Sequence, residues 1–263
     1  MNIPCILSIQ SSVVSGRVGN SAAVPIHALF GHETLCVNSV VLAAHPGIME
    51  STKFVTPTEQ MACLLAELQE VKSIDDISAI HSGYLGHKEH VNVIQKYVTN
   101  HPKSIYVYDP VFGDNDSLYI DSLLACESKK RLLPLATITT PNMFELSYLS
   151  NTKVSNIDTA IKASKILQSK GPKWVLSTGV FSMEDEIADV LVGPKTINTF
   201  HHKRKKEGVS GAGDTLAAIL TSLLVSGENC TEAAKKASNI TQSLINLSSS
   251  SQNMPPLSTE LIC

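Results

Sequence analysis

The sequence predicts an α/β fold in which a central, mostly parallel sheet is flanked by helices on both faces. Short apolar segments alternate along the chain with longer segments of helical periodicity, the pattern of repeated strand and helix units. The 263 residues contain no internal repeat and no Gly/Ser-rich linker, so we expect a single domain over residues 1–263. Hydrophobic residues make up 43% of the chain and charged residues 17%, a balance that can cover a large core.

Strands are expected where short apolar or alternating runs end at turn-forming or polar residues. These runs are Cys5–Ile9, Thr34–Leu42, Ile80–Ser82, Ile105–Tyr108, Thr137–Thr140, Trp174–Ser177 and Ala188–Val192. Helices are expected where apolar residues recur at helical spacing, namely over Ser21–Leu29, Thr58–Glu70, Lys88–Thr99, Leu118–Arg131, Asn156–Lys170, Gly211–Ser226 and Thr231–Leu247. Residues 248–263 open on a serine run and include Pro255-Pro256, so we expect a loosely ordered end with a short docking segment.

Polar residues stand at the expected carboxyl ends of four strands: Ser11, Asp109, Thr140 and Thr178. In open parallel sheets, ligands bind in the crevice beyond these ends. We therefore expect the functional site along this edge of the sheet.

Composition excludes several classes of protein. The formal net charge is -3, so no global basic surface suggests binding to nucleic acid. The N-terminus has no basic leader and no apolar run is long enough for a membrane helix, so we expect no membrane association and a cytoplasmic location. The 6 cysteines form no C-x-x-C pair, and most lie in apolar stretches, which predicts buried thiols in a reducing compartment.

The strongest chemical signal is Gly211-Ala212-Gly213-Asp214-Thr215, which opens an apolar helical stretch. Small residues allow a tight turn that leaves backbone N–H groups free at a helix N-terminus, where they favour a phosphate or a developing anion. A carboxylate beside such an anion hole can take the proton of a substrate hydroxyl as that oxygen attacks the γ-phosphorus of a nucleotide. The alternative is that Asp214 only caps the helix.

Five motifs in order resemble those of the pyridoxal kinases, which belong to the ribokinase-like superfamily. They are Leu7-Ser8-Ile9-Gln10-Ser11 with Gly16-Arg17-Val18-Gly19-Asn20, then Ser82-Gly83-Tyr84-Leu85-Gly86, Asp109-Pro110-Val111-Phe112-Gly113-Asp114, Thr140-Pro141-Asn142-Met143-Phe144-Glu145, and the Gly211–Asp214 box. Together they cover residues 5 to 225. The resemblance implies a ribokinase-like fold, phosphorylation of a B6 vitamer by ATP, a Mg²⁺ cofactor and a homodimer. A monovalent cation such as K⁺ is a further candidate, and the sequence leaves its requirement open.

The resemblance also implies a role for each matching residue. Ser11 would hydrogen-bond the pyridine ring, and Val18 and Tyr84 would pack about it. Asp214 and the His45-Pro46-Gly47 segment would also bind the substrate. Asp109 and Glu145 would organise Mg²⁺, largely through water. The ATP-binding residues would be Asp109, Asp114, Tyr119, Thr140, Asn142, Glu145, Ser177, Thr178 and Gly179. Asp214 would be the catalytic base, with Gly211, Ala212 and Gly213 forming the anion hole.

These carboxylates have alternative interpretations. Asp109 also suits a turn before Pro110, and Glu145 suits the first turn of a helix, where its charge complements the dipole. Ser11 could be an ordinary loop hydroxyl and Tyr84 an ordinary packed aromatic. The basic run of residues 201–206 is best explained as a solvated loop, and as a cationic rim for ATP in second place.

Two features depart from the family. His45-Pro46-Gly47 stands where pyridoxal kinases usually carry His-Thr-Gly, and proline offers neither a hydroxyl nor an N–H. The box reads Gly-Ala-Gly-Asp, where many pyridoxal kinases have Thr or Val in the middle. A hydroxymethylpyrimidine kinase is the nearest alternative, although those enzymes generally have Cys at the position of Asp214. A non-catalytic vitamin-binding protein with a kinase fold is the alternative from another class.

Overall fold

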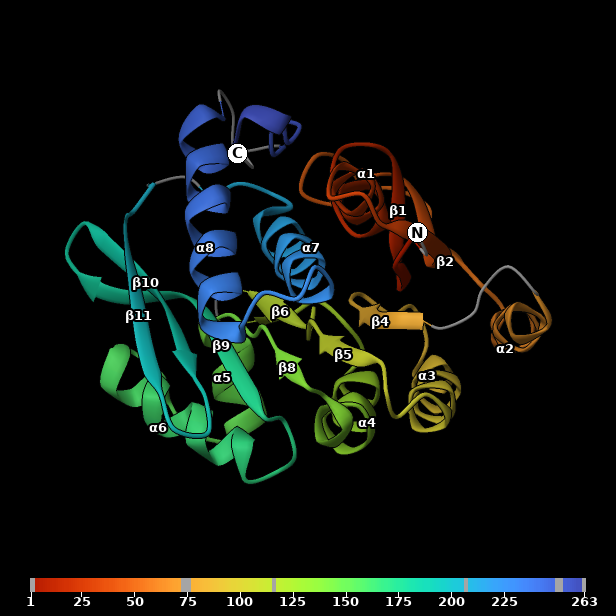
Figure 1. The fold of residues 1–263 in the computed structure, drawn as a ribbon, viewed down its shortest axis with the longest axis horizontal. Helices are drawn as coiled ribbons and strands as arrows, with labels where there is room; N and C mark the ends of the chain where they lie inside the picture. Colours follow the sequence, from red (N-terminus) through yellow and green to blue (C-terminus); the bar gives the residue numbers. More distant parts are fainter. Residues whose placement is uncertain (1–2, 72–76, 115–116, 206–207, 249–252, 262–263) are drawn as a thin grey trace.

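The computed structural model describes residues 3–71, 77–114, 117–205, 208–248 and 253–261. Within these ranges a 9-stranded sheet has the order β11-β10-β9-β8-β5-β4-β1-β2-β3. Parallel pairing joins β9, β8, β5, β4, β1 and β2 in that order. At the two ends of the sheet, β3 pairs antiparallel with β2, and β10 pairs antiparallel with β9 and β11. Helices cover both faces, which confirms the predicted fold class (Figure 1).

The bounds of the elements are as follows. The strands of the sheet are β1 (Cys5–Ser15), β2 (Glu33–Ala44), β3 (Phe54–Val55), β4 (Ile77–Ser82), β5 (Ile105–Tyr108), β8 (Ile138–Thr139), β9 (Trp174–Met183), β10 (Glu186–Val192) and β11 (Ile197–Lys203). A separate ribbon is formed by β6 (Gly113–Asp114) and β7 (Ser117–Leu118). The helices are α1 (Asn20–Leu29), α2 (Thr58–Glu67), α3 (Lys88–Asn100), α4 (Ser122–Arg131), α5 (Met143–Ser150), α6 (Ile157–Gln168), α7 (Ala212–Val225) and α8 (Cys230–Leu247).

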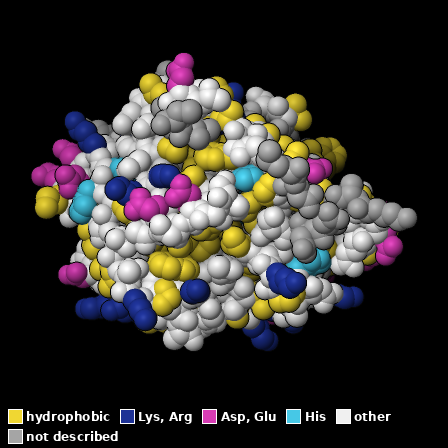
Figure 2. All heavy atoms as spheres, in the orientation of Figure 1, with side chains coloured by type: hydrophobic (Ala, Val, Ile, Leu, Met, Phe, Trp, Pro, Cys, Tyr) yellow, Lys and Arg dark blue, Asp and Glu magenta, His cyan; other side chains and the backbone are white. Residues whose placement is uncertain are grey.

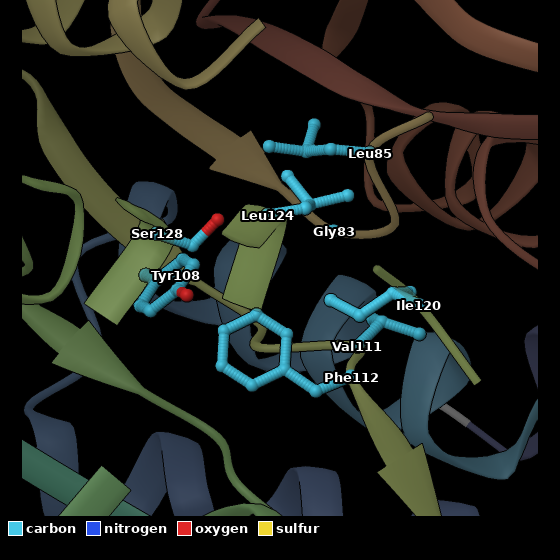
Figure 3. Close-up of a pocket in the computed structure, with 8 residues that line it drawn as sticks. All are labelled: Gly83, Leu85, Tyr108, Val111, Phe112, Ile120, Leu124 and Ser128. Atoms are coloured by element: carbon cyan, nitrogen blue, oxygen red, sulfur yellow. The ribbon is translucent and has the colours of Figure 1, made fainter. Parts of the chain in front are cut away.

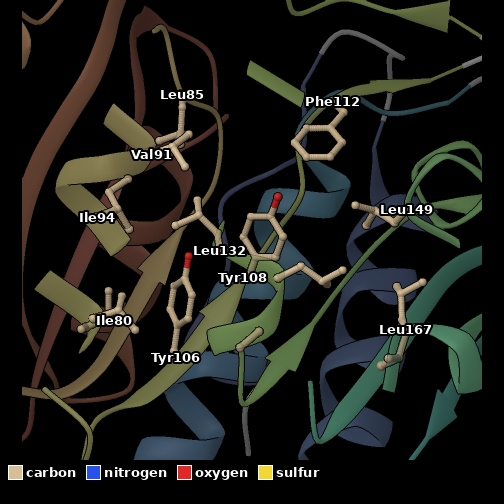
Figure 4. Close-up of a cluster of buried hydrophobic side chains, with 14 of the residues drawn as sticks. Ile80, Leu85, Val91, Ile94, Tyr106, Tyr108, Phe112, Leu132, Leu149 and Leu167 are labelled. Atoms are coloured by element: carbon tan, nitrogen blue, oxygen red, sulfur yellow. The ribbon is translucent and has the colours of Figure 1, made fainter. Parts of the chain in front are cut away.

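The core is divided by the sheet. On one face α1, α7 and α8 pack together, and their Ala and Leu side chains form one apolar cluster with residues of β5, β8 and β9. On the other face a larger apolar cluster includes side chains of the helices α2, α3, α4, α5 and α6. Tyr106, Tyr108 and Leu132 belong to it (Figure 4). Helix α7 lies between α1 and α8, so residues Thr215 to Leu223 of it are all buried. A helix buried this completely holds its N-terminus in a fixed place.

Strand β1 extends beyond its neighbour β4. It pairs with β4 only as far as Ile9, opposite Ser82, and its register with β2 shifts between Gln10 and Ser12. From there to Ser15 it pairs with β2 alone, and β3 adds a short antiparallel strand to β2. The end of β1 and β2 therefore stands past the carboxyl edge of the sheet as a ribbon, and Ser11 lies at its base.

The prediction of a solvated loop for the basic run is wrong for residues 201–203. They belong to β11, in which Ile197–Lys203 pairs residue by residue with β10. Lysine and histidine on an edge strand discourage pairing with other chains, and they also hide the strand from a search for apolar runs. The helix expected over Leu118–Arg131 begins at Ser122, because the carboxylate of Asp121 accepts hydrogen bonds from Leu123 N and Leu124 N. Residue 206 lies outside the described residues.

The expectation of mostly buried cysteines is also wrong. Among the described residues the cysteines are free thiols, and Cys5 is buried whereas Cys36, Cys63 and Cys126 are exposed. The exposed ones occupy outward-facing positions of β2, α2 and α4, so an apolar stretch still presents one face to solvent. Cys263 lies outside the described residues.

The described part of the C-terminal segment contacts the start of the site. Met254 is buried; its N–H donates to Ser210 O (3.3 Å), and its carbonyl accepts from Arg17 Nη1 (3.1 Å). The remainder of the expected loose end, at residues 249–252 and 262–263, lies outside the described ranges. In the part of the chain that the structure describes, no helix has the length and apolarity to cross a membrane.

Candidate active site

The site is organised around the N-terminus of α7. Gly211 is the N-cap of this helix and has a φ of 86°, a left-handed conformation that favours glycine. A Cβ atom there would lie 1.9 Å from the carbonyl oxygen of Arg17, so the residue 15–19 loop is pressed against the predicted anion hole. This contact brings two motifs that are about 200 residues apart in the chain to the same place.

Asp214 is the third residue of α7 and not its cap. Burial raises the pKa of its carboxyl group to about 6, an effect that hydrogen bonds from the backbone of Gly19 and of Asp214 itself partly offset. A pKa slightly below neutral leaves the group mainly ionised near pH 7 and still able to bind a proton, as a general base requires. The N-cap position itself is held by Gly211, while the carboxylate of Asp214 accepts its own N–H within the first turn.

Asp109 and Thr140 meet beside Asp214. Asp109 directly follows β5, and its Oδ1 atom accepts a hydrogen bond from Thr140 Oγ1 (2.7 Å). Asp109 is only 5% exposed, and burial together with the charge of Asp214 raises its pKa to about 7. The hydrogen bond from Thr140 acts in the opposite direction. The carboxylate of Asp214 therefore disfavours a second negative charge on Asp109 at the carboxyl edge of the sheet.

Glu145 and Asn142 form a capping box at the start of α5. Asn142 Oδ1 accepts from Glu145 N (2.9 Å), and Glu145 Oε2 accepts from Asn142 N (2.9 Å). The other oxygen, Oε1, accepts from Phe112 N (2.9 Å), while Asn142 Nδ2 donates to Gly113 O (2.9 Å). Burial and then the charge of Asp109 raise the pKa of Glu145, and these backbone hydrogen bonds lower it. Glu145 thus locks the Asp109–Gly113 segment to α5.

The residues predicted to contact the vitamin ring lie along the β1–β2 ribbon. Val18 packs with Val13, Val40 and Leu42 in a small apolar cluster, and Tyr84 lies against it, half buried. Tyr84 is fixed from both ends, because its carbonyl accepts from Ser39 Oγ (2.6 Å) and its hydroxyl accepts from Lys53 Nζ (3.2 Å).

Ser11 lies at the base of this ribbon. It is buried, and a Cβ atom at Gly19 would lie 2.2 Å from its carbonyl oxygen. Because Gly19 also donates to Asp214, Ser11 and Asp214 are held on either side of one turn.

One backbone N–H of the predicted anion hole already has a partner within the protein. Ala212 N donates to Val209 O (3.2 Å), so this N–H is engaged within the turn. Gly213 is exposed, and a Cβ atom there would meet nothing within 4 Å. The open side of the anion hole is therefore at Gly213, next to Asp214.

The predicted nucleotide side is formed by β9. Ser177 is fully buried, and its hydroxyl donates to the carbonyl oxygen of Val190 on the neighbouring strand β10 (3.2 Å). Thr178 is half exposed and Gly179 is exposed. Thr178 N donates to Pro141 O (3.0 Å), and Thr178 forms an isolated parallel bridge with Asn142. The structure thus joins the nucleotide side to the capping box.

Asp114 and Tyr119 belong to the β6–β7 region, which contacts the carboxylates. Tyr119 N donates to Phe112 O (3.0 Å). The pKa of Tyr119 is raised, by burial of its hydroxyl first and then by the charges of Glu145, Asp214 and Asp109, although 48% of the residue is exposed.

The His45-Pro46-Gly47 segment is a turn after β2. His45 Nδ1 accepts from Gly47 N (3.1 Å), and Pro46 and Gly47 are exposed. Among the hydrogen bonds and ring contacts of the described residues, none joins this turn to Asp214, Ser11 or Tyr84. The role of this segment in holding the vitamin stays a prediction.

The residues present suit a water-rich Mg²⁺ and not a closed metal cage. Among the described residues no group of three or more His, Cys, Asp or Glu side chains could hold a metal ion directly. Asp109 and Glu145, which are buried, and Asp214, which is half buried, nevertheless form an acidic group, and in the described chain none of them is paired with Lys or Arg. Mg²⁺ keeps several of its waters, so carboxylates that reach it through water are sufficient.

A buried polar network beneath the site was missed by the sequence reasoning. Ser8 Oγ donates to Asn20 Oδ1 (2.7 Å), Gln10 Nε2 donates to Ser8 Oγ (2.9 Å) and contacts His81 Nδ1 (3.2 Å), and Asn20 Nδ2 donates to Asn38 Oδ1 (2.9 Å). These bonds fix the start of α1 to β1 and so position the residue 15–19 loop. The signal was present in Ser8 and Gln10, which alternate with apolar residues on a strand predicted to be covered on both faces.

A small pocket lies next to this site but is not part of it. Its walls are mostly apolar and include Tyr108, Phe112, Ile120 and Leu124 (Figure 3). None of the predicted carboxylates lines it in the described chain, so it is a gap in the packing behind the Asp109–Phe112 segment.

The fold and the site define a small-molecule kinase of the ribokinase-like class, and known proteins agree. The family model described as phosphomethylpyrimidine kinase matches residues 27–256. The pyridoxine/pyridoxal/pyridoxamine kinase of Bordetella avium is 31% identical over 241 residues, covering 89% of this chain and 81% of its own. The pyridoxal kinase PdxY of Histophilus somni is 33% identical over 248 residues, with 89% and 85% covered.

Solved structures give the same result. The pyridoxal kinase of Entamoeba histolytica superposes with a TM-score of 0.91 at 26% identity, covering 97% of this chain and 92% of its own. That of Leishmania donovani, in complex with ADP and pyridoxine, superposes with a TM-score of 0.87 at 25% identity, with 92% and 86% covered. The chain therefore belongs to the pyridoxal kinases, within the phosphomethylpyrimidine kinase family.

Proposed function

We propose that the protein transfers the γ-phosphoryl group of ATP to the 5′-hydroxymethyl group of pyridoxal, and also of pyridoxine and pyridoxamine. The observation that carries the proposal is the position of Asp214. Its carboxylate has a pKa raised to about 6, lies in the first turn of a buried helix, and is held against the loop that carries Val18. The relatives' names, as B6 vitamer kinases, support the same substrates.

In the proposed mechanism the vitamin lies between Val18 and Tyr84 with its ring hydrogen-bonded to Ser11. Its hydroxymethyl arm then reaches Asp214, which accepts the hydroxyl proton as that oxygen attacks the γ-phosphorus. Backbone N–H groups on the open side of the anion hole at Gly213 stabilise the charge that builds on the equatorial phosphate oxygens.

The nucleotide lies along Asn142, Thr178 and Gly179, with Asp114 and Tyr119 covering it from the β6–β7 ribbon. We assign Asp109 and Glu145 to Mg²⁺, which when bound neutralises charge on the phosphates. A monovalent cation such as K⁺ completes the proposed set of ions.

The test is an ATP-coupled assay of the purified protein against pyridoxal, pyridoxine, pyridoxamine and hydroxymethylpyrimidine. Formation of pyridoxal 5′-phosphate, read from the absorbance of the product, supports the proposal. Turnover of hydroxymethylpyrimidine alone would identify a hydroxymethylpyrimidine kinase. Vitamer binding without any consumption of ATP would identify a non-catalytic binding protein.

We also propose a homodimer. Phe54 and Val55 on β3 are 67% and 41% exposed, and β3 is an edge strand of the sheet. An apolar edge strand of this kind is a natural surface for a second copy of the chain. Light scattering on the native protein and on Phe54→Glu tests this, and a monomeric wild-type protein would refute it.

No nucleic-acid partner is proposed. On the face shown in Figure 2, Lys and Arg side chains are scattered among acidic and apolar ones and form no single patch. The exposed free thiols of Cys36, Cys63 and Cys126 suit a reducing compartment, so we propose the cytoplasm as the location.

A further inference from the structure

The antiparallel pairing of β9 with β10 contains a bulge at the nucleotide side of the site. Ser177 pairs with Val190 and Val180 pairs with Ala188, so Thr178 and Gly179 together face the single residue Asp189. Gly179 has a φ of 62°, which lies in the left-handed region. Bulges re-aim side chains and are common beside active sites, and this one leaves Thr178 and Gly179 out of the pairing with β10.

Asp189 holds the bulge from inside the protein. It is only 7% exposed, and its Oδ1 atom accepts a hydrogen bond from Gly179 N (2.9 Å). Its other oxygen, Oδ2, accepts from Ser238 Oγ (2.6 Å). His202 Nε2 lies 2.5 Å from the same Ser238 Oγ. Because that hydroxyl gives its proton to Asp189, its oxygen accepts from His202, so Nε2 of His202 carries a hydrogen.

The resulting chain of hydrogen bonds connects three elements. It runs from His202 on β11 through Ser238 on α8 to Asp189 on β10, and ends on the backbone of the bulge in β9. The opposite side of the bulge is held by Pro141, whose carbonyl accepts from Thr178 N (3.0 Å). Thr178 and Gly179 are thus fixed between two independent supports.

Stability alone does not account for a carboxylate at this position. Desolvating a carboxylate is costly, and an apolar residue of similar volume often serves a buried position equally well or better. What an apolar residue cannot do is accept the N–H of Gly179 and keep the bulge in one conformation. A hydrogen-bond acceptor is therefore needed at position 189 to hold the N–H of Gly179 in the bulge.

We infer that Asp189 is a positioning residue for the nucleotide. Through Gly179 N it fixes the backbone conformation that presents Thr178 and Gly179 to ATP, and Ser238 and His202 hold its carboxylate in place. This inference rests on the proposed function, because that proposal places ATP at the bulge. It concerns the affinity for the nucleotide and leaves the vitamin end of the site unaffected.

The test compares Asp189→Ala with Asp189→Asn. Loss of the hydrogen bond to the bulge is expected to raise the KM for ATP about three- to tenfold in Asp189→Ala, with the KM for pyridoxal unchanged. Asp189→Asn should stay within about twofold of wild type. Its amide oxygen still accepts from Gly179, and its NH₂ group donates to Ser238. The Ser238 hydroxyl then donates to Nε2 of His202, whose hydrogen moves to Nδ1 in this variant.

The control is Val190→Ala, which removes a fully buried side chain from the same strand without touching these hydrogen bonds. It should lower the melting temperature and leave the KM for ATP unchanged. Should Asp189→Ala fail to fold, Ser238→Ala takes its place, with an expected increase of about twofold to threefold because it frees the carboxylate at its other end. A melting temperature lowered without any change in the KM for ATP, or an equal rise in both KM values, would overturn the inference.

Calorimetric titration with the Mg²⁺ complex of AMP-PNP separates the two proposals. If wild type binds AMP-PNP but turns over no vitamer, the proposed function fails. The Kd values of the Asp189 variants for AMP-PNP, compared with that of wild type, then still decide the role of Asp189. If wild type does not bind AMP-PNP, the role of Asp189 in nucleotide binding is refuted as well.

Discussion

Replacing Asp214 by Asn tests the mechanism most directly. Asn keeps the size of the side chain and can still accept from Gly19 N, but it cannot take up a proton. With a pKa of about 6, the wild-type carboxyl group is roughly nine-tenths ionised at pH 7 and available as a base. Removing a general base costs about 10²–10⁴-fold in rate, or about 3–5 kcal/mol of barrier. We expect a loss of kcat in this range, with the KM for ATP and the melting temperature close to wild type.

The assay is the steady-state formation of pyridoxal 5′-phosphate at saturating ATP, together with thermal melting of each variant. The matched control is Asp121→Asn, because Asp121 is a genuine N-cap whose Oδ1 atom accepts from Leu123 N and Leu124 N. Asn is an equally good cap, so this variant should keep full activity. A kcat near wild type in Asp214→Asn would refute the assignment of the base and with it the proposed mechanism.

Further predictions concern metal, substrate and acid. Asp109→Asn should raise the Mg²⁺ concentration for half-maximal rate several-fold, as a Mg²⁺ titration would measure, and an unshifted curve removes this residue from the metal site. Pro46→Thr restores a hydroxyl worth about 0.5–1.5 kcal/mol, so the KM for pyridoxal should fall by up to roughly tenfold, while the control Pro46→Ala should not improve it. Unchanged KM values in both variants would place this exposed turn away from the vitamin. His81 is fully buried, and burial lowers its pKa from 6.5 to about 3. Its contribution to stability is therefore complete above pH 6.5 and is lost as the pH falls towards 3, because the unfolded chain binds the proton first. The free energy of unfolding falls by up to about 1.4 kcal/mol per pH unit in this range. His81→Gln should give a shallower fall of melting temperature between pH 6.5 and 4.5 than wild type, and equal slopes would contradict this account.

Much of the fold could be predicted because its signals are local. The strand at Ile105–Tyr108 and the helix that follows the Gly211 box were predicted within one or two residues of the observed bounds. The expected strand ends also placed Ser11, Asp109, Thr140 and Thr178 at one edge of the sheet, since parallel strands bring their carboxyl ends together. The hydrogen bond from Thr140 to Asp109 agrees with that expectation.

What the sequence did not predict depends on partners distant in the chain. β11 is a strand only because β10 pairs with it, and its histidines and lysine give no apolar signal of their own. Ser238 is an ordinary small residue of α8 until the fold brings it within 2.6 Å of Asp189. The exposure of Pro46 likewise follows from how far β2 extends past the sheet, which local composition does not determine.

The order of strands separates the two ends of the site. The ribbon of β1 and β2, which carries most of the proposed vitamin contacts, is separated from the β9–β10 pair on the proposed nucleotide side by β4, β5 and β8. Only the start of α7 belongs to both ends. Substitutions that share no contacts usually have additive effects on free energy. Changes in the ribbon should therefore combine additively with changes around the bulge, so that this chain could acquire a different acceptor alcohol without any adjustment of its nucleotide side.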